Sequence, residues 1–272
     1  VCFEIDDNLF EILKNIDVVV HLAARVHIMN ESASNPLDEF RRVNTVGTLN
    51  IAKQAGKAGV KRFIYISSIK VLGESTNLNQ PFTNKDSLNP QDAYSKSKAE
   101  AEEGIKNIGK KYGMEIVIIR PPLIYGRGVK GNFASLQKLA RLRIPMPIGL
   151  IKNKRSLVSV ENLVDLIITC LDHKNAKNQT FLVSDDCDLS SPELFSMLCK
   201  AGGYNSYIFK FPISILKILF QLSGKLAFYD RLSSTMQINI DYTKSILEWR
   251  PPFNLENSLQ NCWLLDKRYK EG

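Results

Sequence analysis

Tyr94 and Lys98 are the residues whose types and spacing most clearly suggest chemistry. They are the first and last residues of the run Tyr-Ser-Lys-Ser-Lys at 94–98. Side chains four positions apart on a helix share one face. A tyrosine with its ordinary pKa of about 10 is a poor proton shuttle at neutral pH, but a nearby ammonium would lower that pKa toward the working range. The pair therefore predicts general acid–base chemistry at Tyr94, although this spacing is also common on surface helices.

Two serine hydroxyls lie at the end of the strand that precedes the Tyr94 helix. The apolar run Phe-Ile-Tyr-Ile delivers Ser67 and Ser68 at its carboxyl end, and parallel sheets bind ligands at that end of their strands. Ser68 could then hydrogen-bond the same substrate oxygen that Tyr94 protonates. The three residues Ser68, Tyr94 and Lys98 together predict a catalytic site.

The elements that must hold these residues alternate between strand and helix. Alternation of this kind predicts βαβ units and a parallel sheet, so the expected fold class is α/β, a Rossmann-type doubly wound sheet. The expected strands are 17–23, 62–67 and 115–120, and the expected helices are 36–58 and 92–112.

The pattern changes after residue 126. Turns rich in Gly and Pro are followed by shorter helices expected around Asn162, Pro192 and Pro212. Two parts are therefore expected: residues 1–126 form the main sheet domain, and residues 127–272 form a smaller, mostly helical substrate lobe that is interleaved with the last sheet strands.

Composition favours a folded protein and argues against a nucleic-acid site or a metal centre. The chain has 272 residues, 44% hydrophobic and 24% charged, which is typical of a folded globular protein. Its net charge of +8 comes from Lys and Arg interleaved with Glu, a pattern that favours a solvated surface over a nucleic-acid site. Five scattered cysteines and three histidines favour a reducing cytoplasm and no metal centre.

No membrane span is expected from the sequence. The nearest candidate is the run 211–228, which is broken by Pro212, Lys217, Gly224 and Lys225. A buried or dimer-facing helix is the preferred interpretation of this run, and a membrane-surface helix is the alternative.

Several ordered motifs, taken together, resemble a known family. They are His-Leu-Ala-Ala (21–24), Asn-Thr-Val-Gly-Thr (44–48), Ser-Ser-Ile-Lys-Val-Leu-Gly-Glu (67–74), the run 94–98, Arg-Pro-Pro-Leu-Ile-Tyr-Gly (120–126), residues 155–165 and Leu-Glu-Trp-Arg-Pro-Pro (247–252). The chain resembles the extended short-chain dehydrogenase/reductase family in its nucleotide-sugar epimerase and reductase branch. The resemblance runs from about residue 17 to residue 252.

The resemblance implies a role for each matching residue. Ser68 and Tyr94 would bind the substrate oxygen, and Lys98 would also hold the nicotinamide ribose of NAD or NADP. The remaining cofactor contacts would be Leu22, Ala23, Ala24, Asn44, Ser67, Pro121 and Pro122, with Asn44 also bracing neighbouring strands. Asn132 and Arg155 would contact the diphosphate of a nucleotide sugar. Packing is the alternative role for Asn44 and the alanines, and a surface salt bridge is the alternative for Arg155.

One family motif is missing. No G-x-x-G-x-x-G loop, which would cradle the cofactor pyrophosphate, occurs in the chain. We expect a βαβ unit of about 30 residues or more to precede Val1, and without it the 17–23 strand would expose an apolar edge. The residue that distinguishes NAD from NADP would also lie there.

The residues at positions 69 and 70 reduce the number of reactions that the resemblance allows. The related sugar 4,6-dehydratases carry Asp-Glu where this chain has Ile69 and Lys70, and 3,5-epimerase/reductases carry Cys in place of Ile69, so both reactions are disfavoured. The resemblance implies chemistry at sugar C4, either 4-epimerisation of a UDP-sugar or reduction of a UDP-4-keto-6-deoxy-N-acetylhexosamine, for bacterial surface polysaccharide.

Reduction is slightly favoured because Leu72 replaces the usual epimerase tyrosine. A homodimer is usual in this family. The rival hypothesis is a non-catalytic nucleotide-binding or scaffold protein on the same fold.

Overall fold

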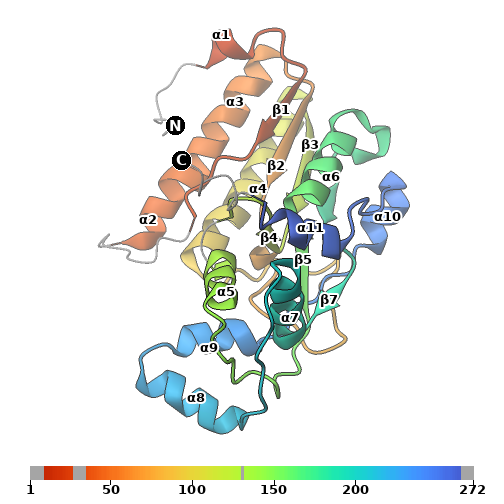
Figure 1. The fold of residues 1–272 in the computed structure, drawn as a ribbon. Coiled ribbons are helices and arrows are strands. Elements are labelled where there is room, and N and C mark those ends of the chain that lie inside the picture. Colours follow the sequence, from red (N-terminus) through yellow and green to blue (C-terminus); the bar gives the residue numbers. More distant parts are fainter. Residues whose placement is uncertain (1–8, 27–34, 130–131, 265–272) are drawn as a thin grey trace, which may run out of the picture.

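The computed structural model describes residues 9–26, 35–129 and 132–264 (Figure 1), with the side chains of Asn132 and Ala227 left out. Its main sheet contains four parallel strands in the order β1-β2-β3-β6. Their bounds are β1 (Val18–His21), β2 (Arg62–Ile66), β3 (Glu115–Arg120) and β6 (Thr180–Leu182). This sheet confirms the predicted α/β class.

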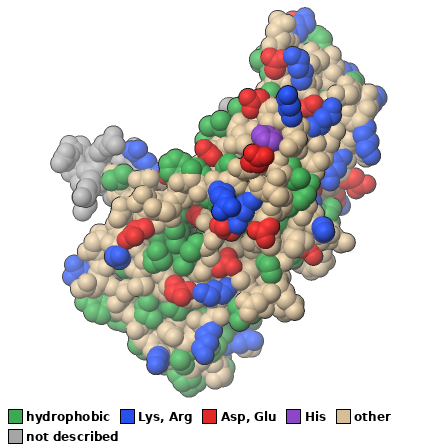
Figure 2. Space-filling view, turned by 90° about the vertical axis from the view of Figure 1, so that its right-hand side faces the viewer, with side chains coloured by type: hydrophobic (Ala, Val, Ile, Leu, Met, Phe, Trp, Pro, Cys, Tyr) green, Lys and Arg blue, Asp and Glu red, His purple; other side chains and the backbone are tan. Residues whose placement is uncertain are grey.

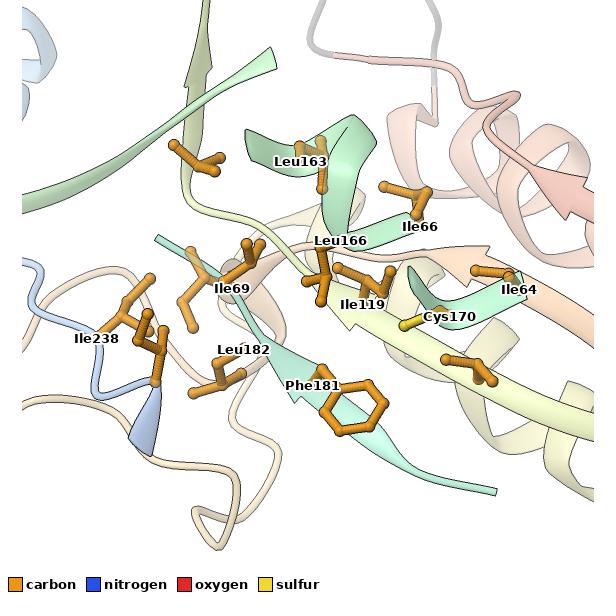
Figure 3. Packing of buried hydrophobic residues seen from close by; sticks show 14 of the residues in the cluster. Ile64, Ile66, Ile69, Ile119, Leu163, Leu166, Cys170, Phe181, Leu182 and Ile238 are labelled. Atoms are coloured by element: carbon orange, nitrogen blue, oxygen red, sulfur yellow. The ribbon is translucent and has the colours of Figure 1, made fainter. Parts of the chain in front are cut away.

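Helices cover both faces of the sheet (Figure 1). On one face lie α3 (Thr48–Ala58) and α4 (Ala93–Tyr112), and on the other lies α6 (Val160–Asp172). The two sides of β2 divide accordingly: Phe63 and Tyr65 join the cluster under α3 and α4, while Ile64 and Ile66 pack with α6 (Figure 3). Burial on both faces explains why this strand is almost wholly apolar.

The predicted helix 36–58 contains an irregularity. It consists of α2 (Pro36–Phe40), a π-helical segment η1 (Arg41–Gly47) and then α3. Asn44 lies in this segment, where its side chain accepts from Arg25 N at 2.7 Å and donates to Arg25 O at 3.0 Å. Sequence periodicity could not show this change, which often marks a functional position.

The second part of the molecule has its own sheet and core. Strands β4 (Leu123–Tyr125), β5 (Arg155–Ser159) and β7 (Asp188–Leu189) form the sheet. The lobe helices are α5 (Asn132–Arg141), α7 (Ser191–Ala201), α8 (Ile213–Leu222), α9 (Leu226–Ser233) and α11 (Leu255–Asn261). Buried residues from each of these helices form a cluster around Phe133, Phe195 and Trp263.

The smaller elements complete the described chain. They are α1 (Phe10–Leu13), η2 (Ile69–Val71), η3 (Lys174–Ala176) and α10 (Asp241–Leu247). Helices occur where they were predicted around Asn162, Pro192 and Pro212. Within the described ranges, no helix is both long and apolar enough to cross a membrane, and no group of three or more His, Cys, Asp or Glu residues could hold a metal ion.

Candidate active site

The carboxyl end of β2 presents two serines in different environments. Ser67 is buried, and its hydroxyl has no hydrogen-bond partner among the described residues. Ser68 is half-buried and caps η2, where its hydroxyl accepts from Lys70 N at 3.3 Å. Ser68 therefore lies between the end of β2 and the start of η2, with its hydroxyl held by the backbone of η2.

Helix α4 begins with a capping box that fixes the position of Tyr94. Asp92 accepts from Ser95 N at 2.7 Å, and Ser95 Oγ in return accepts from Asp92 N at 3.1 Å. Lys70 donates to the other oxygen of Asp92 at 2.7 Å. Tyr94 therefore lies in the first turn of a helix whose start is anchored to the segment that follows Ser68.

The structure brings the predicted Ser68–Tyr94 pair together, but the pKa of Tyr94 differs from expectation. Burial, followed by the charge of Asp92, raises this pKa to about 12, and a hydrogen bond with Ser68 acts in the opposite direction. The prediction that a nearby ammonium lowers the Tyr94 pKa is wrong for this structure. Tyr94 is held as a neutral phenol, the form that can donate a proton.

The position of Lys98 explains why it does not lower the Tyr94 pKa, because its ammonium is directed toward β2. The side chain is buried, donates to Ile66 O at 2.8 Å and lies 4.6 Å from the ring centre of Tyr65. Burial lowers the Lys98 pKa to about 8, while the charge of Glu102 raises it. Lys98 is thus a buried group that can carry a proton close to neutral pH.

From the sequence, we did not identify His21, Glu102 and Arg120 as residues of the site. His21, at the end of β1, lies 2.9 Å from Thr48 Oγ1 and stacks on Tyr65 with ring centres 5.9 Å apart. Glu102 forms a two-point ion pair with Arg120 at 3.0 and 2.6 Å, and both side chains are buried. The series 94, 98, 102 at helical spacing could have indicated Glu102.

The loop after β1 carries the remaining predicted cofactor contacts. Strand β1 ends at His21, so Leu22 is exposed beyond it, and Ala23 and Ala24 are half-buried. Asn44 is fully buried and also donates to Ser97 Oγ at 3.1 Å. It therefore joins this loop to α4 at Ser97, three positions from Tyr94.

Pro121 and Pro122 are buried directly after β3, where Pro121 O accepts from Ile69 N at 2.9 Å. The carboxyl ends of β2 and β3 thus lie side by side, as a ligand site in a parallel sheet requires.

The predicted diphosphate contacts lie in the lobe. Arg155 donates to Arg231 O at 2.9 Å and to Ser234 Oγ at 2.8 Å, and burial lowers its pKa. Among the residues that the structure describes, Arg155 forms no salt bridge, and its hydrogen bonds go to carbonyl and hydroxyl oxygens. Asn132 begins α5, but its side chain lies outside the described part of the chain.

Glycines between β4 and α5 form a feature that the sequence analysis did not use. A side chain at Gly126 would come within 2.5 Å of Val160, and Gly128 has a φ of 74°. Both requirements favour glycine, and the loop leads into the first turn of α5. Helix starts of this kind can bind phosphate groups.

The parallel sheet, the serines at a strand end and the Tyr-x-x-x-Lys helix define the short-chain dehydrogenase/reductase class of fold. Comparison with known proteins agrees. Residues 3–184 match the NAD dependent epimerase/dehydratase family, and the chain belongs to that family.

One relative and two solved structures show the extent of the similarity. The chain is 50% identical over 249 residues to a UDP-glucose 4-epimerase of Vibrio cholerae, covering 91% of this chain and 76% of the relative. It superposes on a UDP-glucose 4-epimerase of Thermotoga maritima with a TM-score of 0.77 at 19% identity, over 98% and 84% of the two chains. A UDP-glucuronic acid 4-epimerase of Bacillus cereus in complex with NAD gives a TM-score of 0.76 at 20% identity, over 97% and 78%.

Proposed function

We propose that the chain catalyses an NAD(P)-dependent reaction at C4 of a UDP-sugar, with 4-epimerisation as the first candidate. The observation that carries the proposal is the interaction of the Ser68 hydroxyl with the Tyr94 phenol, which acts on the Tyr94 pKa, beside the buried Lys98. The relative from Vibrio cholerae, at 50% identity, supports this choice of reaction.

The chemistry follows from the protonation states of the site. The neutral phenol of Tyr94 donates its proton to the C4 oxygen when a 4-keto sugar is reduced, and takes it back when the C4 hydroxyl is oxidised. Ser68 holds the same oxygen by a hydrogen bond. Lys98, with a pKa of about 8, supplies positive charge on the same side of α4. Epimerisation also requires the keto sugar to turn over between the two steps.

The residues near β2 fit the nicotinamide end of a dinucleotide, which would exchange a hydride with C4. Ser67 supplies a buried hydroxyl without a described partner, and Lys98 can donate beyond its single bond to Ile66. We propose that both hold the ribose and carboxamide region, with Pro121 and Pro122 beside the ring. Leu22, Ala23, Ala24 and Asn44 would line the cofactor path.

Substrate binding is proposed for the lobe. The start of α5 at Asn132 and the guanidinium of Arg155 would bind the UDP diphosphate, because arginine grips phosphate at two points. Arg155 would exchange its present carbonyl partners for the phosphate oxygens. Synthesis of surface polysaccharide and a homodimer are part of the same proposal.

Dehydration is not favoured by the geometry. Ile69, which stands where a dehydratase has an acid, is buried in the core, and Lys70 is paired with Asp92 and Glu74. Neither can protonate a leaving oxygen. A scaffold protein would not need a buried lysine beside a paired tyrosine and serine, so the catalytic hypothesis is preferred.

Reduction of a 4-keto sugar is the second candidate, because Leu72 is buried where the related epimerases have a tyrosine. One assay separates the two reactions, since a reductase consumes one reduced cofactor per turnover. The full gene product should interconvert UDP-glucose and UDP-galactose without added reductant, and show no net change in nicotinamide absorbance. Stoichiometric loss of NADH or NADPH with a UDP-4-keto-6-deoxy-N-acetylhexosamine would favour reduction instead.

A further inference from the structure

Helix α8 presents its apolar stripe to the outside of the molecule. Ile215, Ile218, Leu219 and Leu222 follow the i, i+3, i+4, i+7 spacing that normally faces a core. Their exposed fractions are 48%, 54%, 52% and 81%. Of the expected buried or dimer-facing helix in the 211–228 segment, the buried alternative is wrong for this face, and the dimer-facing alternative stays a prediction.

The opposite side of α8 holds it firmly on the lobe. Leu216 is buried, and the ring of Phe220 lies 5.8 Å from Phe228 and 6.0 Å from Tyr229, both on α9. The exposed stripe is thus not the result of an undocked helix. Tyr207 and Phe209, on the segment leading to α8, are also about half exposed.

The sequence on either side of the stripe carries charge of a single sign. No Asp or Glu occurs between Glu193 and Asp230, in a chain that has 28 acidic residues. Lys210, Lys217 and Lys225 are all exposed in or beside α8. At the lower end of the molecule, where Figure 1 places α8, Figure 2 shows hydrophobic and basic side chains, with the acidic ones higher up.

We propose that α8 docks on the surface of an anionic phospholipid membrane. An exposed apolar stripe with basic neighbours is the pattern of helices that lie in the plane of a bilayer surface. The three lysines would face anionic headgroups while the stripe enters the boundary of the acyl chains. This inference does not depend on the proposed reaction, because it uses no residue of the catalytic site.

The test is sedimentation of the 272-residue chain with lipid vesicles. The chain should bind vesicles in which about a third of the lipid is phosphatidylglycerol, and should bind pure phosphatidylcholine vesicles much more weakly. Binding should fall as salt rises, because salt screens the lysines. The double variant Ile218→Gln/Leu222→Gln should bind at least about tenfold more weakly.

Matched controls test whether binding depends on this surface, rather than on any exposed apolar side chain or any group of lysines. Ile168→Gln removes an equally exposed side chain on α6 and should leave binding unchanged. The triple variant K210Q/K217Q/K225Q should lose binding, whereas K106Q/K110Q/K177Q, which removes three lysines lining a cavity of about 400 Å³ near the start of β3, should not. Circular dichroism should show the same fold for all variants.

Three results would overturn the proposal. They are no sedimentation with the anionic vesicles, equal loss of binding in the control variants, or a concentration-dependent dimer in light scattering that Ile218→Gln/Leu222→Gln abolishes. The last result would show that a second copy of the chain covers α8.

Discussion

At the scale of single residues, burial sets the chemistry of the site more strongly than charge pairing does. Tyr94, Lys98 and His21 all have a pKa shifted toward the neutral form, and burial is the first cause each time. A site of this kind holds an uncharged proton donor next to a lysine that can lose its proton near neutral pH. The sequence could predict which residues meet, but not these shifts, because burial depends on the whole fold.

Replacing Tyr94 with Phe in the full gene product should lower turnover by at least about a hundredfold, since general acid–base catalysis typically contributes that much. Binding of UDP-sugar, measured by calorimetry, should be retained. Tyr112→Phe, at the other end of α4, is the control and should keep full activity. Retained turnover in Tyr94→Phe would show that the Ser68–Tyr94 pair serves only packing.

The stability of the fold should depend on His21 in mild acid. Burial, and then the charge of Lys98, lowers the His21 pKa from 6.5 to about 4. The unfolded chain therefore takes up a proton first as the pH falls, so the folded state loses stability between about pH 6.5 and pH 4. The loss from this group is about 3 kcal/mol.

Urea denaturation of His21→Gln should show a smaller decrease in the free energy of unfolding over this range than the parent chain. If the free energy of unfolding changed equally with pH in the variant and the parent chain, His21 would already be protonated in the folded state or accessible to water.

At the scale of elements, the sequence predicts regular segments well and irregular ones poorly. Strand β3 occupies the predicted residues 115–120, and α4 begins one residue later than predicted because Asp92 is its cap. The π-helical segment at 41–47 was missed, and so was the contact of its Asn44 with a residue nineteen positions away, because periodicity along the chain does not reveal such contacts. The Glu102–Arg120 pair was missed for the same reason, because it joins two elements.

That ion pair links α4 to the end of β3 and should be important for stability. Glu102→Leu leaves the Arg120 guanidinium buried without its partner, and we expect a loss of about 3–5 kcal/mol in the free energy of unfolding. The double variant Glu102→Leu/Arg120→Met should be more stable than this single variant, because it leaves no buried charge.

A matched exposed pair on the same helix provides the control. Glu100 bonds Arg41 at 2.6 Å, and both side chains are more than a third exposed, so Glu100→Leu should cost less than about 1 kcal/mol. Similar losses from Glu102→Leu and Glu100→Leu in urea denaturation would contradict a special role for the buried pair.

At the scale of the whole molecule, the two halves of the proposed nucleotide-sugar site are built on separate cores. Two clusters pack against the two faces of the main sheet and a third fills the lobe, while β6 returns from the later part of the chain to pair with β3. The boundary at residue 126 and the interleaving of the lobe with the last sheet strands both remain predictions. Within the described residues, β1 pairs only with β2.

The two halves should therefore differ in ligand binding when the 272-residue chain is studied by itself. The lobe contains the glycine loop, the start of α5 and Arg155, and should bind UDP. We propose Ser67 and Lys98 of the main sheet as contacts for the nicotinamide end of a dinucleotide, but the chain has no G-x-x-G-x-x-G turn for the pyrophosphate. Calorimetric titration should thus show UDP binding and only weak binding of NAD or NADPH. Micromolar affinity for either dinucleotide would show that β2, β3 and the loop after β1 suffice to hold the cofactor.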